Sequence, residues 1–108
     1  MALADDLLPK VKANLILQHD EDDMLLRGYI HTAVDYAETY QKKPSGFYSK
    51  RRSRMSPTTE QAVIILSSHF YESRDGSTGG FFADNTGAAA QVWVSVHRLL
   101  MMGKDWVV

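Results

Sequence analysis

The fold class of this chain is indicated by one stretch, EDDMLLRGYIHTAVDYAETYQ, which occupies residues 21–41. Apolar side chains recur in it at intervals of four and three residues, as on one face of an α-helix: Leu26, Ile30, Ala33, Ala37 and Tyr40. Three acidic residues open the stretch and two lysines follow it, and both placements suit the helix dipole. The stretch therefore predicts a long amphipathic helix that packs on more than one neighbour.

Polar residues around the same stretch predict how the helix begins and which ion pairs its surface carries. Asp20 is expected to be the N-cap residue, with Asp23 three positions later in a capping-box arrangement. Asp23–Arg27 and Glu38–Lys42 have the i,i+4 spacing at which opposite charges meet on a helix, each pair contributing about 0.3 kcal/mol.

Three further helices are expected, over residues 3–14, 58–74 and 86–102. The first contains Pro9, which favours a start nearer Leu7 because proline is best tolerated in the first helical turn. The run from Ala62 to Leu66 is apolar nearly all round, so its helix is expected to be the central and most buried one. The chain is therefore predicted to be a single all-α domain over residues 1–108, a bundle of four to five helices.

The segment of residues 42–57 differs in composition from the rest of the chain and is called the basic loop. It contains no acidic residue and half of the chain's 12 basic ones, Lys42, Lys43, Lys50, Arg51, Arg52 and Arg54. Pro44, Gly46 and Pro57 interrupt it, which predicts a long, mobile loop. Phe47 and Tyr48 could stack on bases beside these cations. Contact with a protein partner, proximity to DNA and simple solvation all remain open for this loop.

A second loop, rich in glycine, is expected over about residues 75–85. It lacks the Gly-Lys-Ser/Thr of a phosphate-binding loop and follows a helix rather than a strand. Phe81 and Phe82 lie in it, and two adjacent phenylalanines must pack either on their own core or on another subunit.

Composition and charge exclude several classes of protein. The chain has 108 residues with 12 basic and 13 acidic side chains, so its net charge of −1 does not fit a basic, general nucleic-acid binder. It has no cysteine, which excludes disulfides, iron–sulfur clusters and thiol catalysis. Its longest strongly apolar run, residues 62–66, is far short of the roughly 20 residues that span a bilayer. The first charged residues, Asp5 and Asp6, are acidic, unlike those of a secretory signal.

The polar residues form no recognisable catalytic, metal or cofactor motif. The acidic run from Asp20 to Asp23 lacks the ligand spacing of a calcium loop. The four histidines form no zinc-protease motif or i,i+4 pair. His69 follows two serines in one helix, where neighbours do not face each other, so we expect a hydrogen-bonded core or interface histidine. We therefore expect no enzyme activity, no metal and no cofactor.

The order of motifs along the chain resembles the head-to-tail connector family of tailed bacteriophages, also described as head-completion or DNA-packaging adaptor proteins. The motifs are Lys12-x-x-Leu15, the acids of residues 20–23, Leu26-x-x-x-Ile30-x-x-Ala33-x-x-Tyr36, Ala62–Leu66 leading into His69-Phe70-Tyr71-Glu72-x-Arg74, and Leu99-Leu100 near a tryptophan. The resemblance spans nearly the whole chain, and the basic loop is not part of its pattern.

The resemblance implies a structural protein rather than an enzyme, found in the virion and made in the cytoplasm of the host bacterium. It implies a ring of about a dozen identical subunits. The ring would dock on the portal vertex of the filled capsid, extend the DNA channel without sequence-specific binding, and offer a platform for the next head-completion protein or the tail. The contacts between subunits of a ring are heterologous, so the two surfaces that meet should differ.

Apolar residues beyond the needs of a four-helix core are the candidates for these subunit contacts: Tyr29, Tyr36, Phe81, Phe82, Trp93 and Trp106. The helices of residues 21–41 and 86–102 are expected to carry the contact surfaces. The cations of the basic loop are candidates for a further interface or for proximity to DNA. An alternative function is a small DNA-binding module that uses residues 50–54, which predicts strongly salt-dependent binding of duplex DNA.

Overall fold

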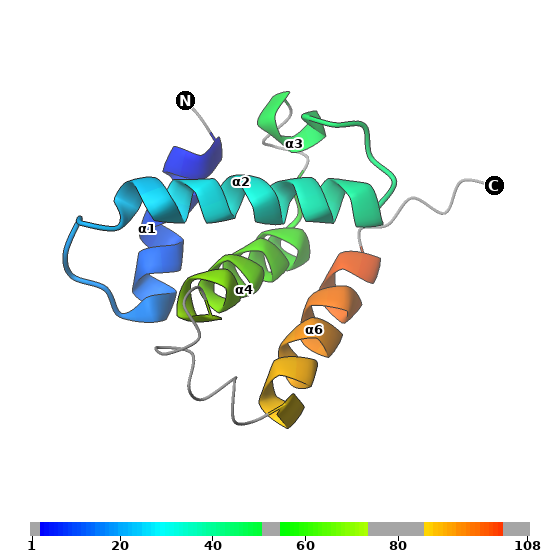
Figure 1. Cartoon of the computed structure of the whole chain (residues 1–108). Coiled ribbons are helices and arrows are strands. Elements are labelled where there is room, and N and C mark those ends of the chain that lie inside the picture. Colours follow the sequence, from blue (N-terminus) through cyan, green and yellow to red (C-terminus); the bar gives the residue numbers. More distant parts are fainter. Residues whose placement is uncertain (1–2, 51–54, 74–85, 103–108) are drawn as a thin grey trace.

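The computed structural model describes residues 3–50, 55–73 and 86–102, and within these ranges the chain forms helices and no strand (Figure 1). The helices are α1 (Leu3–Leu15), α2 (Asp23–Tyr40), α3 (Phe47–Lys50), α4 (Pro57–Ser73) and α6 (Thr86–Met101). The all-α class predicted from the sequence is confirmed. No helix among the described residues has both the length and the apolar character needed to cross a membrane.

Helix α4 is the centre of the fold, as its all-round apolar sequence predicts. It lies between α1 and α6, and α2 crosses over α1 and α4 (Figure 1). Ala62, Val63 and Leu66 are each 1% exposed. Because neighbours cover α4 on several sides, most of its side chains face protein rather than water, which explains why the helix lacks a polar face.

The apolar face of α2 is buried as expected, with Leu26, Ile30, Ala33 and Ala37 in the core. The beginning of the helix differs from the prediction. The N-cap residue is Asp22, and it makes no side-chain capping hydrogen bond. The expected cap by Asp20 is wrong because Lys12 of α1 binds the carboxylates of both Asp20 and Asp23, at 2.5 and 2.9 Å.

The two predicted i,i+4 ion pairs on α2 do not form, because Asp23, Arg27 and Glu38 make tertiary interactions instead. Arg27 donates from Nε to Asp5 of α1 at 2.7 Å, and Asp23 pairs with Lys12. Glu38 is 3% exposed, and its carboxylate accepts the backbone N–H groups of Gly46 and Tyr48. Buried backbone donors need acceptors, and Glu38 is in reach of two of them.

Helix α1 begins at Leu3, which confirms the predicted range of residues 3–14, and the later start near Leu7 that Pro9 favoured is wrong. Leu3 and Ala4 are buried in the core, at 5% and 2% exposure. Their burial holds the first turn in helical form although Pro9 cannot donate a backbone hydrogen bond.

The basic loop is not the continuous mobile loop that its composition suggested. Its central residues form α3, and α4 already begins at Pro57. Tyr48 and Met55 are buried in the core at 2% and 7% exposure. The apolar side chains of this segment therefore anchor it to the bundle. The prediction of a mobile loop rested on its cations and helix-breaking residues alone.

Candidate interaction surfaces

Aromatic side chains of α2, α4 and α6 pack together in one cluster. Tyr29 packs on Phe70 with ring centroids 6.0 Å apart, and Tyr36 packs on Trp93 at 5.6 Å. Tyr40 stacks on His97 at 5.1 Å. Each of these side chains is partly exposed. The cluster therefore closes the junction of the three helices and also presents rings at the surface.

Burial changes the ionisation of two members of this cluster. It raises the pKa of Tyr36 above its usual value, so the phenol keeps its proton to a higher pH than an exposed tyrosine does. The hydroxyl oxygen of Tyr36 and Nε2 of His97 are 2.5 Å apart. Burial also lowers the pKa of His69, whose ring packs edge-on against Trp93 at 5.8 Å. Both effects favour uncharged side chains in the cluster.

The cluster contains three of the predicted subunit-contact residues, Tyr29, Tyr36 and Trp93. Their rings pack mainly within their own subunit, and their contact with a second subunit stays a prediction. The other three, Phe81, Phe82 and Trp106, lie outside the described residues.

The cations of the basic loop do not converge on one point among the described residues. Lys42 is exposed just after α2, and Lys50 is exposed at the end of α3. The ammonium group of Lys43 lies 5.1 Å from the ring centroid of Phe47. Arg51, Arg52 and Arg54 lie outside the described residues. The expected availability of Tyr48 for stacking on bases is wrong, because its ring is buried in the core.

A buried polar network, not anticipated from the sequence, holds the basic loop against the bundle. Gln41 is fully buried, and its amide donates to Thr59 Oγ1 of α4 and to the backbone oxygen of Leu100 of α6, each at 2.9 Å. The hydroxyl of Tyr48 donates to the amide oxygen of Gln41. One signal was present in the sequence: Gln41 follows Ala37 by four residues, on the buried face of α2.

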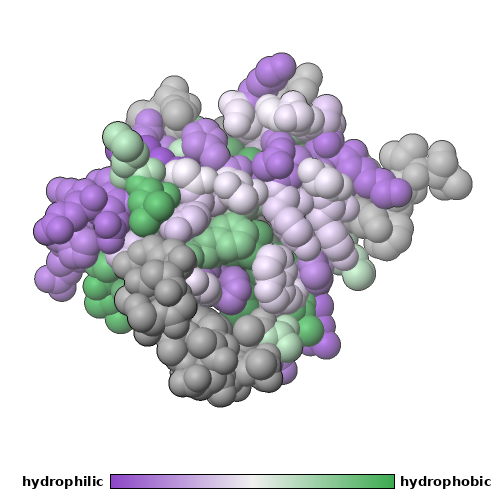
Figure 2. Space-filling view, in the orientation of Figure 1, coloured by the Kyte–Doolittle hydropathy of each residue, from purple (hydrophilic) through white to green (hydrophobic). Residues whose placement is uncertain are grey.

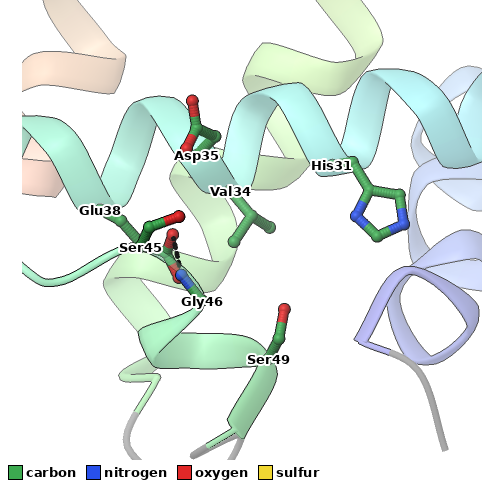
Figure 3. Close-up of a pocket in the computed structure, with 7 residues that line it drawn as sticks. All are labelled: His31, Val34, Asp35, Glu38, Ser45, Gly46 and Ser49. Carbon is green, nitrogen blue, oxygen red and sulfur yellow. Dashed lines mark hydrogen bonds between the residues drawn. The ribbon is translucent and has the colours of Figure 1, made fainter.

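A shallow pocket of about 210 Å³ lies between α2 and the segment leading into α3 (Figure 3). Its lining comes from α2 and from residues 45–49: His31, Val34, Asp35, Glu38, Ser45, Gly46 and Ser49. Glu38 points toward Gly46, whose N–H it accepts at 3.1 Å, so this carboxylate is committed to structure. Among the described residues no group of three or more histidine, aspartate or glutamate side chains is placed to hold a metal ion.

Large apolar side chains are exposed in two separate places. The first, called the α1–α2 corner, has two parts: Ile16 directly after α1, and Met24 and Leu25 at the start of α2. The second, called the α6 face, comprises Val94, Met101 and Met102. Helix α4 lies between the two, and Figure 2 shows apolar surface over the start of α2 at one side of the view and over α6 at the other.

Residues 5–93 match the model of a protein family described as phage gp6-like head-tail connector protein. The match takes in α1 to α4 and the first half of α6. The chain belongs to this family. Comparison with curated proteins and with solved structures finds no significant match. The protein is thus a structural connector of the phage virion rather than an enzyme, and it assembles with portal and tail proteins.

In the part of the chain that the structure describes, charged and exposed apolar side chains have uses that suit a structural connector. Its titratable side chains hold helices together: Lys12 joins α1 to the start of α2, and Arg27 joins α2 to α1. Its exposed apolar residues are gathered at two sides of the molecule, as contacts with other proteins require.

Proposed function

We propose that the connector works as a ring of about a dozen copies between the portal and the tail. It is made in the cytoplasm of the host bacterium and docks on the portal vertex of the filled head. There the ring extends the DNA channel and presents a platform for the next head-completion protein or for the tail.

The observation that carries this proposal is the presence of two unlike exposed apolar surfaces on different sides of one small subunit. A two-fold dimer uses the same surface on both copies, whereas a ring joins one surface to a different one on the next copy. The α1–α2 corner and the α6 face lie on different sides of the subunit and consist of different residues, which supports heterologous contacts.

Among the described residues each surface has three large apolar side chains, so one contact between free subunits is expected to be weak. Docking on the portal would hold several subunits side by side and raise their effective concentration. Assembly that needs a portal template is therefore compatible with the proposal.

The charge of the connector agrees with a channel through which DNA slides. A subunit of net charge −1 does not hold DNA by general attraction to phosphates. The basic loop is the local exception, and a variant with serine at Lys50, Arg51, Arg52 and Arg54 defines its role. Loss of ring assembly or of portal docking identifies an interface, whereas loss of affinity for duplex DNA alone supports the alternative DNA-binding module.

The proposal is tested by native mass spectrometry of the purified connector over a concentration series, first alone and then with purified portal. We expect a closed species of about a dozen subunits in at least one of the two conditions. A connector that stays monomeric alone and does not bind the portal would refute the proposal.

A further inference from the structure

We infer that neighbouring copies in the ring join through the α1–α2 corner of one connector and the α6 face of the next. The inference rests on the proposed ring and adds to it the two surfaces that meet and the polarity of the contact. The occupant of each surface is thus a second copy of this chain.

The α1–α2 corner contains an isoleucine where the backbone favours glycine. Ile16 has a φ of 59°, in the left-handed region, and the N–H of Leu17 donates to the carbonyl of Lys12 at 2.9 Å, as in a Schellman motif. A β-branched residue is disfavoured in this conformation, and the side chain of Ile16 is 81% exposed. Within the isolated subunit this side chain gains little from burial, whereas an apolar surface of another copy would cover it.

Most of the α6 face lies along the exposed side of its helix, and Met102 directly follows the helix. Val94, Arg98 and Met101 follow one another at spacings of four and three residues and are all exposed. Val96 and Leu100, on the other side of the helix, are buried in the core. The exposed side of α6 thus combines apolar side chains with one cation.

The charges beside the two surfaces are opposite in sign. Asp20, with a side chain 86% exposed, and the exposed Glu21 lie beside Met24 at the start of α2. Arg98 lies within the α6 face, and the exposed Lys42 follows the end of α2, where the Gln41 amide donates to the carbonyl of Leu100 of α6 at 2.9 Å. The acidic end and the basic end are separated by the 18 residues of α2, about 27 Å along the helix.

This arrangement of charge selects the polarity of the contact. When a corner meets the α6 face of another copy, the acidic and basic side chains attract each other. When two corners meet, acidic side chains face one another and repel, and two α6 faces repel in the same way. The charges therefore oppose two-fold dimers and favour the head-to-tail contacts that close a ring.

Cysteine cross-linking tests the contact directly, because the chain has no cysteine of its own. The variant with both Met24→Cys and Met101→Cys carries one thiol on each surface, and both native side chains are exposed. Under mild oxidation in the condition that gives rings, we expect a ladder of disulfide-linked multimers on a denaturing gel. Each single variant should stay largely monomeric, because its thiol faces a methionine across the contact, and it cannot pass beyond a dimer, because one thiol forms one disulfide.

The matched control combines Met101→Cys with Gln61→Cys, because Gln61 is exposed on α4 outside both surfaces. It should give no multimer ladder. Rings that native mass spectrometry detects in the Met24→Cys, Met101→Cys variant, but that give no ladder, would overturn the inference and leave the proposed function intact. Absence of a ring in the unmodified connector, both alone and with portal, would instead refute the proposed function.

Charge reversal tests the polarity independently of cross-linking. Glu21→Lys and Arg98→Glu should each weaken association by about tenfold per contact, because each places like charges across the interface. The variant that carries both changes restores an opposite pair and should regain most of the lost association in native mass spectrometry. A double variant no better than the two single ones would overturn the assignment of these charges to one contact.

Discussion

Replacement of Gln41 by alanine tests the buried network that joins α2, α3, α4 and α6. The change removes the donor to Thr59 and to the carbonyl of Leu100, and the acceptor of the Tyr48 hydroxyl. Thr59 keeps a second partner, because Ser56 Oγ lies 3.2 Å from its hydroxyl oxygen. The losses that matter are therefore those of the Leu100 carbonyl and the Tyr48 hydroxyl, and each buried polar group left unsatisfied costs about 1–3 kcal/mol.

The free energy of unfolding of the Gln41→Ala connector should fall by about 3–5 kcal/mol, once the small cavity is added to the two unsatisfied groups. This is a large part of the 5–15 kcal/mol by which a typical domain is stable. Equilibrium urea unfolding, followed by tryptophan fluorescence and by circular dichroism, measures it.

The matched control is Gln61→Ala, which removes the same side chain from an exposed position on α4 and should change stability by less than about 0.5 kcal/mol. Tyr48→Phe removes only one hydroxyl and should cost about 1–2 kcal/mol. A loss below about 1 kcal/mol for Gln41→Ala would refute the reasoning, because two buried groups would then have found other partners at almost no cost.

Three further predictions concern stability and pH. Ile16→Gly should stabilise the subunit by about 0.5–1 kcal/mol in urea unfolding, because glycine adopts the left-handed backbone conformation without strain. The same change should weaken ring formation in native mass spectrometry. Lower stability together with unchanged rings would contradict this prediction. The hydrogen bond from Lys12 lowers the pKa of Asp20. This pair should therefore stabilise the fold above the unfolded pKa of the carboxyl group and lose that effect on acidification. In a plot of melting temperature against pH, Lys12→Met should flatten the acid side. Burial lowers the pKa of His69, so on acidification the unfolded chain binds a proton at this ring before the folded chain does. The free energy of unfolding should therefore fall as pH drops below about 6.5. His69→Gln should remove this dependence of stability on pH, and an unchanged dependence would refute the prediction.

The helices were predictable from the sequence because their signal is local. Leu26, Ile30 and Ala33 reveal a buried face by their spacing alone, and the apolar run of residues 62–66 indicated the central position of α4. The boundaries were less accurate, since burial of Leu3 and Ala4 extended α1 beyond the start that Pro9 suggested.

The candidate surfaces were predictable only in part. Tyr29, Tyr36 and Trp93 were chosen as apolar residues beyond the needs of the core, and the structure places their rings in one cluster within the subunit. The α1–α2 corner was not anticipated, because exposure of Ile16 and Met24 depends on how α1 meets α2. Sequence spacing records which residues share a helix face but not which faces remain uncovered after packing.

The sequence by itself determined the helical class of this connector, the central role of α4 and the resemblance to its family. These depend on periodicity and on the order of motifs, both of which are properties of the chain. The tertiary structure alone decided the partners of the polar residues. Glu38 accepts backbone N–H groups just before and within α3 rather than pairing with Lys42, and Arg27 binds Asp5 rather than Asp23. A charged side chain binds whichever acceptor or donor the packed helices bring within reach, and those groups lie far away in sequence.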